Sequence, residues 1–390
     1  MTKAAARDYA RFAAAALFIA GLPGPALAQL AVSSNDNKEV QVDGVRSVVP
    51  NAPPDTATII DLGVTPPKII AELNVPGSWS APPQSVAITP DESLALVANS
   101  TKIDPANPGK TTPDNTLTVI DLKARPPVVI GRLATGNRAA GISINRAGTL
   151  ALVANRGEGT VSVFAIEGKN VTAVAKVELC ARDCAPSLPV FTPDGKSALV
   201  TRNNDHKVSV LAVDGKVVTY TKVDIAANLS PYGLEITPKG DVAIVANIGN
   251  GPAGGTDTIG VIDLKLTPPR LVDAISVGLI PEGIALSPDG TFLAADVMNG
   301  SNLPKSSPFF NDYGLLKIYR LAGTRLSPVT EAKVGHWCEG IVWSNDQRTL
   351  LVQCMVEKRI LVFRFDGTKL KAAGSLAVNG GPAGIRVAGR

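Results

Sequence analysis

The 390-residue sequence has only two histidines, His206 and His336. A zinc centre built from three histidines is therefore excluded, and a Ser-His-Asp triad would have to use one of these two. The chain also has no Cys-x-x-Cys-His segment, no glycine-rich phosphate loop and no His-Glu-x-x-His segment. Attached c-type haem, P-loop nucleotide chemistry and that class of metalloprotease are not encoded. We accordingly expect no metal and no cofactor.

The sequence also has no large excess of one charge and few long apolar runs. Lysine and arginine number 38 against 34 aspartates and glutamates, and no long basic run occurs. The chain therefore lacks the electrostatic footprint of nucleic-acid binding. After residue 28 no segment approaches 18 consecutive apolar residues, so the mature protein is expected to have no integral membrane segment.

The first 28 residues have the order of parts of a secretory signal peptide. Three basic residues precede an apolar run over residues 12–22, which is too short to span a bilayer. Ala26 and Ala28 then supply the small residues of a cleavage site. We expect cleavage near Ala28, a single mature domain over residues 29–390, and a periplasmic or secreted protein.

The strongest positive signal is internal repetition. The segment Leu-Val-Ala-Asn, or a close copy of it, ends at Asn99, Asn155 and Asn247, and turns such as Ser-Pro-Asp-Gly precede the equivalent segments. The repeat recurs about every 50 residues. Its copies can be aligned at Ser85, Gly141, Leu188, Gly233, Gly283, Gly340 and Gly384. The asparagines are expected to serve turns, because asparagine tolerates positive φ and caps turns with its side chain.

Each repeat contains four short apolar or β-branched segments separated by turn residues. In three copies a Pro-Pro pair follows the third segment, as expected at a turn or an outer edge strand. Four antiparallel strands in about 50 residues are typical of a β-propeller blade. The last copy is incomplete, and residues 30–35 and 58–61 resemble the strands it lacks. We predict an all-β, seven-bladed propeller whose last blade is closed by N- and C-terminal strands.

The Leu-Val-Ala-Asn segments and strands such as Thr160-Val161-Ser162-Val163 resemble the YVTN-type β-propeller repeat. The resemblance covers essentially the whole mature chain and implies a propeller fold. It is far less specific for function. Proteins of this kind include exported proteins of unassigned role, lactonases, muconate-lactonising enzymes and the propeller subunits of bacterial amine dehydrogenases.

A candidate site follows from the direction of the strands. The long insertions 35–57, 100–116, 248–258 and 298–314 all connect second to third strands, so they are expected on one face. The first strands begin on that same face, around the mouth of the central channel. A concave mouth lined by mixed charges is a default binding site. The candidate ligand-binding residues are Arg138, Arg202, Tyr232, Glu282, His336 and Glu339.

The four cysteines are expected to form two disulfides in an exported protein. Cys338 and Cys354 flank a hairpin turn at Asp346 and should lie opposite each other. Cys180 and Cys184 would close a small loop before the next blade.

Three functions remain open from the sequence. The first is a binding scaffold, expected to be monomeric, that presents its loop-rich face to a protein or small-molecule ligand. The second is a lactonase-type hydrolase at the channel mouth, using His336, Glu282, Glu339 and Arg138 as base, acid and carboxylate anchor. The third is the propeller subunit of a periplasmic amine dehydrogenase, which would require a separate quinone-bearing subunit. Whether the protein is an enzyme stays open.

Overall fold

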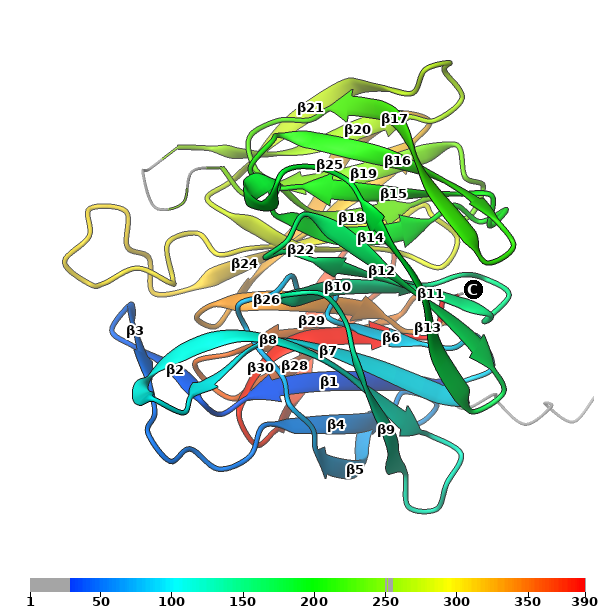
Figure 1. Cartoon of the computed structure of the whole chain (residues 1–390). Coiled ribbons are helices and arrows are strands. Elements are labelled where there is room, and N and C mark those ends of the chain that lie inside the picture. Colours follow the sequence, from blue (N-terminus) through cyan, green and yellow to red (C-terminus); the bar gives the residue numbers. More distant parts are fainter. Residues whose placement is uncertain (1–28, 250, 252–254, 390) are drawn as a thin grey trace, which may run out of the picture.

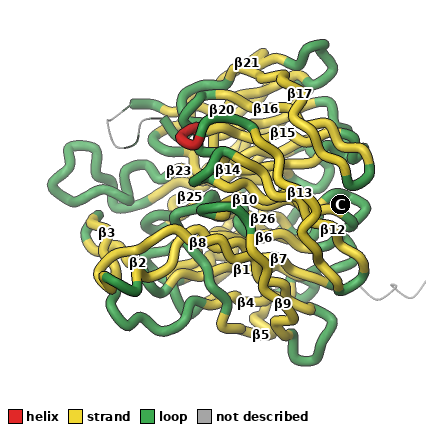
Figure 2. Tube along the Cα trace, viewed as in Figure 1, coloured by secondary structure: helices red, strands yellow, loops and turns green. Residues whose placement is uncertain are grey.

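Seven antiparallel sheets of four strands each make up most of the regular structure (Figure 1). The computed structural model describes residues 29–249, 251 and 255–389, so the signal-peptide prediction for residues 1–28 lies outside the described residues. Within the described part, the single helical element is a 3₁₀ turn at Arg182–Cys184, drawn red in Figure 2. The predicted all-β, seven-bladed architecture is confirmed. Among the described residues, no helix is long and apolar enough to cross a lipid bilayer.

Six blades are built from four consecutive strands each. Blades 1 to 3 contain β6 (Val86–Ile88), β7 (Leu94–Asp104), β8 (Asn107–Asp121) and β9 (Val128–Ala134); β10 (Ala139–Ile144), β11 (Leu150–Asn155), β12 (Thr160–Glu167) and β13 (Asn170–Glu178); and β14 (Pro186–Phe191), β15 (Ser197–Arg202), β16 (Lys207–Asp214) and β17 (Val217–Ala226). Blades 4 to 6 contain β18 (Pro231–Ile236), β19 (Val242–Asn247), β20 (Asp257–Asp263) and β21 (Arg270–Gly278); β22 (Pro281–Leu286), β23 (Phe292–Val297), β24 (Gly314–Ala322) and β25 (Arg325–Val334); and β26 (Cys338–Trp343), β27 (Thr349–Cys354), β28 (Arg359–Phe365) and β29 (Leu370–Ala377).

The seventh blade joins the two ends of the described chain. Its sheet order is β30 (Gly381–Val387), β1 (Leu30–Asp36), β4 (Thr56–Asp61) and β5 (Lys68–Asn74). The innermost strand comes from the C-terminal end, and Arg386 pairs with Val32 in the register. The predicted closure by strands from both ends is confirmed. Hydrogen bonding between the ends leaves no open sheet edge at which the ring would separate.

The repeated glycine has a packing cause. A Cβ atom placed on Gly141 would lie 2.5 Å from the carbonyl oxygen of Ser187, and one on Gly283 would collide with the carbonyl of Glu339. In both cases the obstacle is the first strand of the next blade. Glycine therefore lets neighbouring first strands approach closely around the central channel. Farther out, apolar side chains of adjacent blades interleave, as in the cluster around Phe164 that joins blades 1 and 2.

The recurring asparagines have a different role from the one expected. Asn155 is the last residue of β11 and is not in the left-handed region. Its amide donates to the hydroxyls of Thr160 (2.8 Å) and Ser162 (2.9 Å), and its oxygen accepts from the Gly136 N–H (2.9 Å). The side chain thus ties the second strand to the third strand and to the incoming link. Buried polar groups at this strand end need such partners.

Both predicted disulfides are present. Cys338 and Cys354 face each other directly in the register of β26 and β27. Cys180 and Cys184 close the link between β13 and β14, immediately around the 3₁₀ turn.

The second-to-third connections extend from the left side of the molecule in Figure 1. The first insertion folds into a hairpin of β2 (Glu39–Val42) and β3 (Val45–Val48), which we call the lid hairpin. The second is an arm formed by the long β7 and β8. The third is a loop over residues 298–313, which has no strand. The fourth insertion is only partly within the described residues.

Candidate functional site at the channel mouth

Three predicted residues occupy one equivalent position in three consecutive blades. Tyr232, Glu282 and Glu339 are each the second residue of a first strand, directly before the repeat glycine. All three are buried at the mouth of the channel, under the loop-rich face. The repeat therefore brings a phenol and two carboxyls from separate blades into one cluster.

Burial dominates the protonation of the two glutamates. Desolvation raises the pKa of Glu282 to about 7, although Arg46 and Arg156 act to lower it. Desolvation and the charge of Glu282 raise the pKa of Glu339 well above its usual range. Glu339 therefore favours its protonated form. Two carboxyls in one desolvated site hold a shared proton for this reason.

A third carboxyl lies behind them. Asp296 on β23 accepts a hydrogen bond from the Gly283 N–H at 2.8 Å, and its other oxygen has no partner. Burial, followed by the charge of Glu282, raises its pKa well above normal. We call Glu282, Asp296 and Glu339 the carboxyl half of the mouth.

Two arginines from blade 2 form the opposite side, the arginine half. Arg156 donates to the hydroxyl of Ser187 and to the side-chain oxygen of Asn203 (2.9 Å), with its guanidinium 5.5 Å from the Tyr232 ring centroid. Arg138 has a buried Nε without a partner. In the described part of the chain, neither arginine has a carboxylate within ion-pair distance. Desolvation lowers the pKa of Arg156, although the charge of Glu282 acts to raise it.

Tyr232 stands between the two halves. Burial, with the charge of Glu282, raises the pKa of its phenol, so the hydroxyl stays protonated. Beneath it the channel is narrow: a Cβ atom on Gly233 in blade 4 would lie 3.4 Å from the side-chain nitrogen of Gln84 in blade 1. The oxygen of Gln84 is buried without a partner.

The lid hairpin covers this cluster. Arg46 of β3 lies with its guanidinium 4.3 Å from the Trp79 ring centroid, and Trp79 stacks on Trp337 with centroids 4.7 Å apart. Trp337 in turn donates from its indole nitrogen to Glu339 at 3.3 Å. Arg46, Arg156 and Trp79 were not identified from the sequence. Their only sequence signals are that Trp79 is one of three tryptophans and that Arg156 directly follows Asn155.

His336 lies at the rim rather than in the buried cluster. Its Nδ1 is 2.7 Å from a Glu357 oxygen, and its Nε2 is 3.0 Å from a carboxylate oxygen of Asp312 in the 298–313 loop. Partial burial opposes protonation, but the hydrogen bonds to Glu357 and Asp312 raise the pKa above its ordinary value. An imidazole whose two nitrogens are both engaged by carboxylates ties the loop to the rim and is poorly placed to act as a base.

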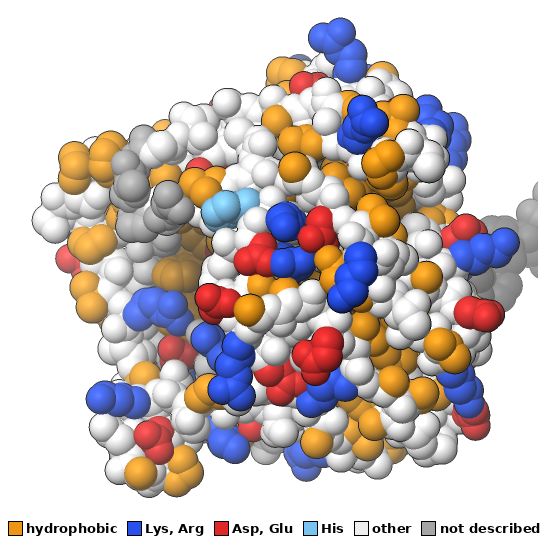
Figure 3. Space-filling view, turned by 45° about the horizontal axis from the view of Figure 1, so that its top comes forward, with side chains coloured by type: hydrophobic (Ala, Val, Ile, Leu, Met, Phe, Trp, Pro, Cys, Tyr) orange, Lys and Arg blue, Asp and Glu red, His pale blue; other side chains and the backbone are white. Residues whose placement is uncertain are grey.

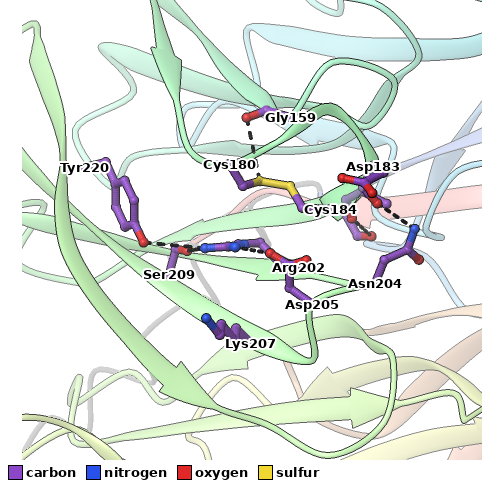
Figure 4. Close-up of a disulfide and its surroundings, with 12 residues drawn as sticks. Gly159, Cys180, Asp183, Cys184, Arg202, Asn204, Asp205, Lys207, Ser209 and Tyr220 are labelled. Carbon is purple, nitrogen blue, oxygen red and sulfur yellow. Dashed lines mark hydrogen bonds and ion pairs between the residues drawn. A yellow bond between two sulfur atoms is a disulfide. The ribbon is translucent and has the colours of Figure 1, made fainter.

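The side chain of Arg202 does not lie at the channel mouth. It ends β15, where Asn155 ends β11, and its side chain likewise turns toward the third strand (Figure 4). It contacts Asp205, and Asp224 at 3.1 Å. The neighbouring Cys180, Cys184 and Asp205 have ligand atoms within 4.8 Å of one another, but the two sulfurs are joined as a disulfide and are not thiolates.

The opposite end of the channel has another character. A cavity of about 260 Å³ is lined mainly by apolar residues of the first strands. An ion pair between Glu235 and Arg386 (2.6 Å) links blades 4 and 7 there. Across the surface in Figure 3, acidic and basic side chains are interspersed, without a broad area of one sign.

The comparisons with known proteins agree with this architecture. A family model described as "Lactonase, 7-bladed beta-propeller" matches residues 111–230, which include Arg138 and Arg156 but not Glu282 or Glu339. The chain is similar to the solved structure of a putative 6-phosphogluconolactonase from Bacteroides uniformis (15% identity, 92% of this chain and 99% of that chain, TM-score 0.71).

Two further structures show the same likeness. One is the periplasmic gluconolactonase PpgL of Pseudomonas aeruginosa (17% identity, 93% of this chain and 99% of that chain, TM-score 0.65). The other is hydrazine synthase of Kuenenia stuttgartiensis (16% identity, 80% of this chain and 91% of that chain, TM-score 0.60). No curated protein matches the chain. At these identities the likeness shows the fold alone, a seven-bladed propeller.

Proposed function

We propose that this protein is a periplasmic binding propeller that holds a small charged ligand at its channel mouth, under the lid hairpin. The observation that carries the proposal is the arginine half. Arg156 is a desolvated cation, Arg138 has a buried Nε without a partner, and among the described residues neither has a carboxylate within ion-pair distance; leaving such groups unpaired is costly. An anionic group of the ligand would supply the missing counter-charge, since guanidinium groups bind carboxylates and phosphates in a fixed geometry.

Unpartnered polar atoms support the same conclusion. Arg138 Nε, Glu339 Oε1 and Gln84 Oε1 are all buried without a hydrogen-bond partner, and all belong to residues of the mouth. Each such group costs about 1–3 kcal/mol when left unsatisfied. A polar ligand that reached these atoms would recover part of that cost. The two disulfides and the likeness to a periplasmic gluconolactonase support the location.

Titration calorimetry with gluconate, a small polyhydroxy carboxylate, tests the arginine half. We expect Arg138→Ala and Arg156→Ala each to weaken binding at least tenfold, whereas Arg325→Ala, at the exposed start of β25, leaves it unchanged. Equal affinity in all four proteins would contradict the proposal. A native mass spectrum of protein isolated from the periplasm adds an unbiased readout: a bound small molecule supports the proposal, and a stoichiometric protein subunit favours the amine-dehydrogenase alternative.

Lactone hydrolysis is the second candidate, and the pKa of Glu282 near 7 favours it. A carboxylate with that pKa is suited to general-base work at neutral pH. Glu282 would take a proton from a water whose oxygen attacks the lactone carbonyl. Arg156 would stabilise the developing oxyanion, the ring C–O bond would break, and the proton would pass to the leaving ring oxygen. The match to the lactonase family model supports this candidate.

The hydrolysis candidate has a direct assay. Release of acid from gluconolactone should rise with pH around an apparent pKa near 7 and fall at least 100-fold in Glu282→Gln. His336→Ala should retain activity, because His336 is engaged at the rim. Retained activity in Glu282→Gln with loss in His336→Ala would overturn this assignment.

A further inference from the structure

The residues that contact the Arg46 guanidinium have the composition of a cation-binding site. The guanidinium lies 4.3 Å from the centroid of Trp79 and 5.8 Å from that of Trp337. It donates to the Ser80 hydroxyl at 3.0 Å and forms an ion pair with Glu39 at 3.4 Å. Two stacked indoles facing a cation form the type of surface that binds guanidinium and ammonium ligands.

The carboxyl half also faces the Arg46 guanidinium. Arg46 acts to lower the pKa of both Glu282 and Glu339, so its charge is felt by both carboxyls. Glu339 is fully buried, accepts from the Trp337 indole at one oxygen and has no partner at the other. This free buried oxygen is an unused acceptor beside the tryptophan pair.

Arg46 is held there by a separable element. The side chain of Arg46 is 47% exposed and projects from a hairpin whose strands have four residues each. Two-stranded hairpins of this size are marginally stable without outside support. That support comes from the base, where Lys38 pairs with Asp36 and Asp55, both at 3.0 Å. At the tip, Gln41 donates to the Asn302 carbonyl at 2.7 Å. The base can hold while the arginine leaves.

We propose that Trp79, Trp337 and Glu339 form a guanidinium-binding site, that Arg46 is its tethered occupant, and that a guanidinium group of the ligand displaces it. This inference rests on the proposed function, because it assigns a cationic group to the same ligand. The arginine half would take the anionic end and the tryptophan pair the cationic end. The ligand class is then a guanidino acid, with arginine as its simplest member.

The test uses methylguanidinium and tryptophan fluorescence. The chain has three tryptophans. Two form the site, while Trp343 is buried at the other end of the channel and supplies a constant background. We expect Arg46→Ala to show a saturable fluorescence change with methylguanidinium, at least tenfold tighter than in wild type, where the tethered arginine competes. Neutral N-methylurea, of similar shape, should have no saturable effect.

Matched variants keep the result interpretable. Arg46→Met keeps a long side chain without its charge, and it serves as a second variant in case the short alanine of Arg46→Ala disturbs the hairpin. It should bind methylguanidinium as Arg46→Ala does. Arg325→Ala controls for removal of an exposed arginine and should match wild type. Adding Glu339→Leu, which removes both side-chain oxygens at similar volume, to Arg46→Ala should weaken binding at least fivefold. Absence of saturable binding in both Arg46 variants, or indifference to Glu339→Leu, overturns the proposal.

Free arginine tests whether both halves serve one ligand. In Arg46→Ala, arginine should bind at least tenfold tighter than methylguanidinium, and Arg156→Ala should remove that advantage. Equal binding of the two probes would overturn the guanidino-acid assignment. If gluconate binds through the arginine half while methylguanidinium fails to bind Arg46→Ala, the proposed function stands and this inference falls.

Discussion

Glu282 and Glu339 occupy equivalent positions in neighbouring blades, and the charge of buried Glu282 raises the pKa of buried Glu339. The pKa values of both carboxyls are raised, so the pair carries fewer charges near neutral pH than two separate glutamates would. With Arg138 and Arg156 opposite, the mouth then has surplus positive charge, which is why an anion is the expected ligand on that side.

Replacing Glu282 should change how stability depends on pH. The folded pKa is about 7 against an ordinary value of 4.5. A raised carboxyl pKa stabilises the fold fully below about pH 4.5, and that contribution is lost as pH rises through 7. Wild type should therefore lose up to about 3 kcal/mol from this group between pH 5 and 8, because each tenfold change in proton affinity corresponds to about 1.4 kcal/mol. Urea unfolding at both pH values should show a smaller loss in Glu282→Gln; an identical pH dependence would refute the assignment.

His336 should act as a pH-dependent fastener of the 298–313 loop. Its pKa is raised, so the stabilisation it provides is complete below about pH 6.5 and disappears as pH rises through the folded value. Hydrogen exchange of the loop amides, corrected for the intrinsic pH effect, should increase over that range in wild type. In His336→Gln the loop should exchange rapidly at every pH, while His206→Gln behaves as wild type. A protected loop in His336→Gln would contradict this role.

Close packing at the first strands predicts sharp sensitivity at Gly283. A methyl group there collides with the carbonyl of Glu339, whereas Gly131 on β9 has no atom within 4 Å of such a group. Gly283→Ala should lower the free energy of unfolding by about 1–3 kcal/mol. Gly131→Ala should change it by no more than about 0.5 kcal/mol. Denaturant titration distinguishes them, and equal effects would mean that backbone approach is not what selects glycine.

The cross-strand disulfide should stabilise blade 6. Cys338 and Cys354 are separated by 16 residues, and closing a loop of that length contributes about 2–3 kcal/mol. The double variant Cys338→Ala/Cys354→Ala should lose that amount in a denaturant titration. The Cys180/Cys184 pair spans only 4 residues and should contribute less. A larger loss on removing Cys180 and Cys184 would show that their bridge does more than close a loop.

The fold was largely predictable because each blade repeats the same local pattern. Turns such as Ser-Pro-Asp-Gly mark the strand ends, and the incomplete last copy indicated closure by the first strands. The hairpin around Asp346 likewise placed Cys338 opposite Cys354. Such features depend on neighbours in sequence, so a single chain reveals them.

The site was less predictable because the repeat pattern determines neither the direction of each side chain nor the conformation of the insertions. Tyr232, Glu282 and Glu339 follow from their shared position in the first strand. Arg202 ends a strand near the same face, but its side chain points to the third strand. The alternation of side-chain directions along a strand does not predict the direction of the last side chain. Arg46 lies in an insertion with no counterpart in other blades, so only the folded hairpin brings it to Trp79.

The most direct test of the account is the affinity of gluconate for wild type and for Arg156→Ala, measured by titration calorimetry near pH 7. If the mouth is an anion-binding site, wild type binds one gluconate and Arg156→Ala binds it at least tenfold more weakly, with Arg325→Ala unchanged. If wild type binds no gluconate, or binds it equally well without Arg156, the channel mouth is not the site that we propose.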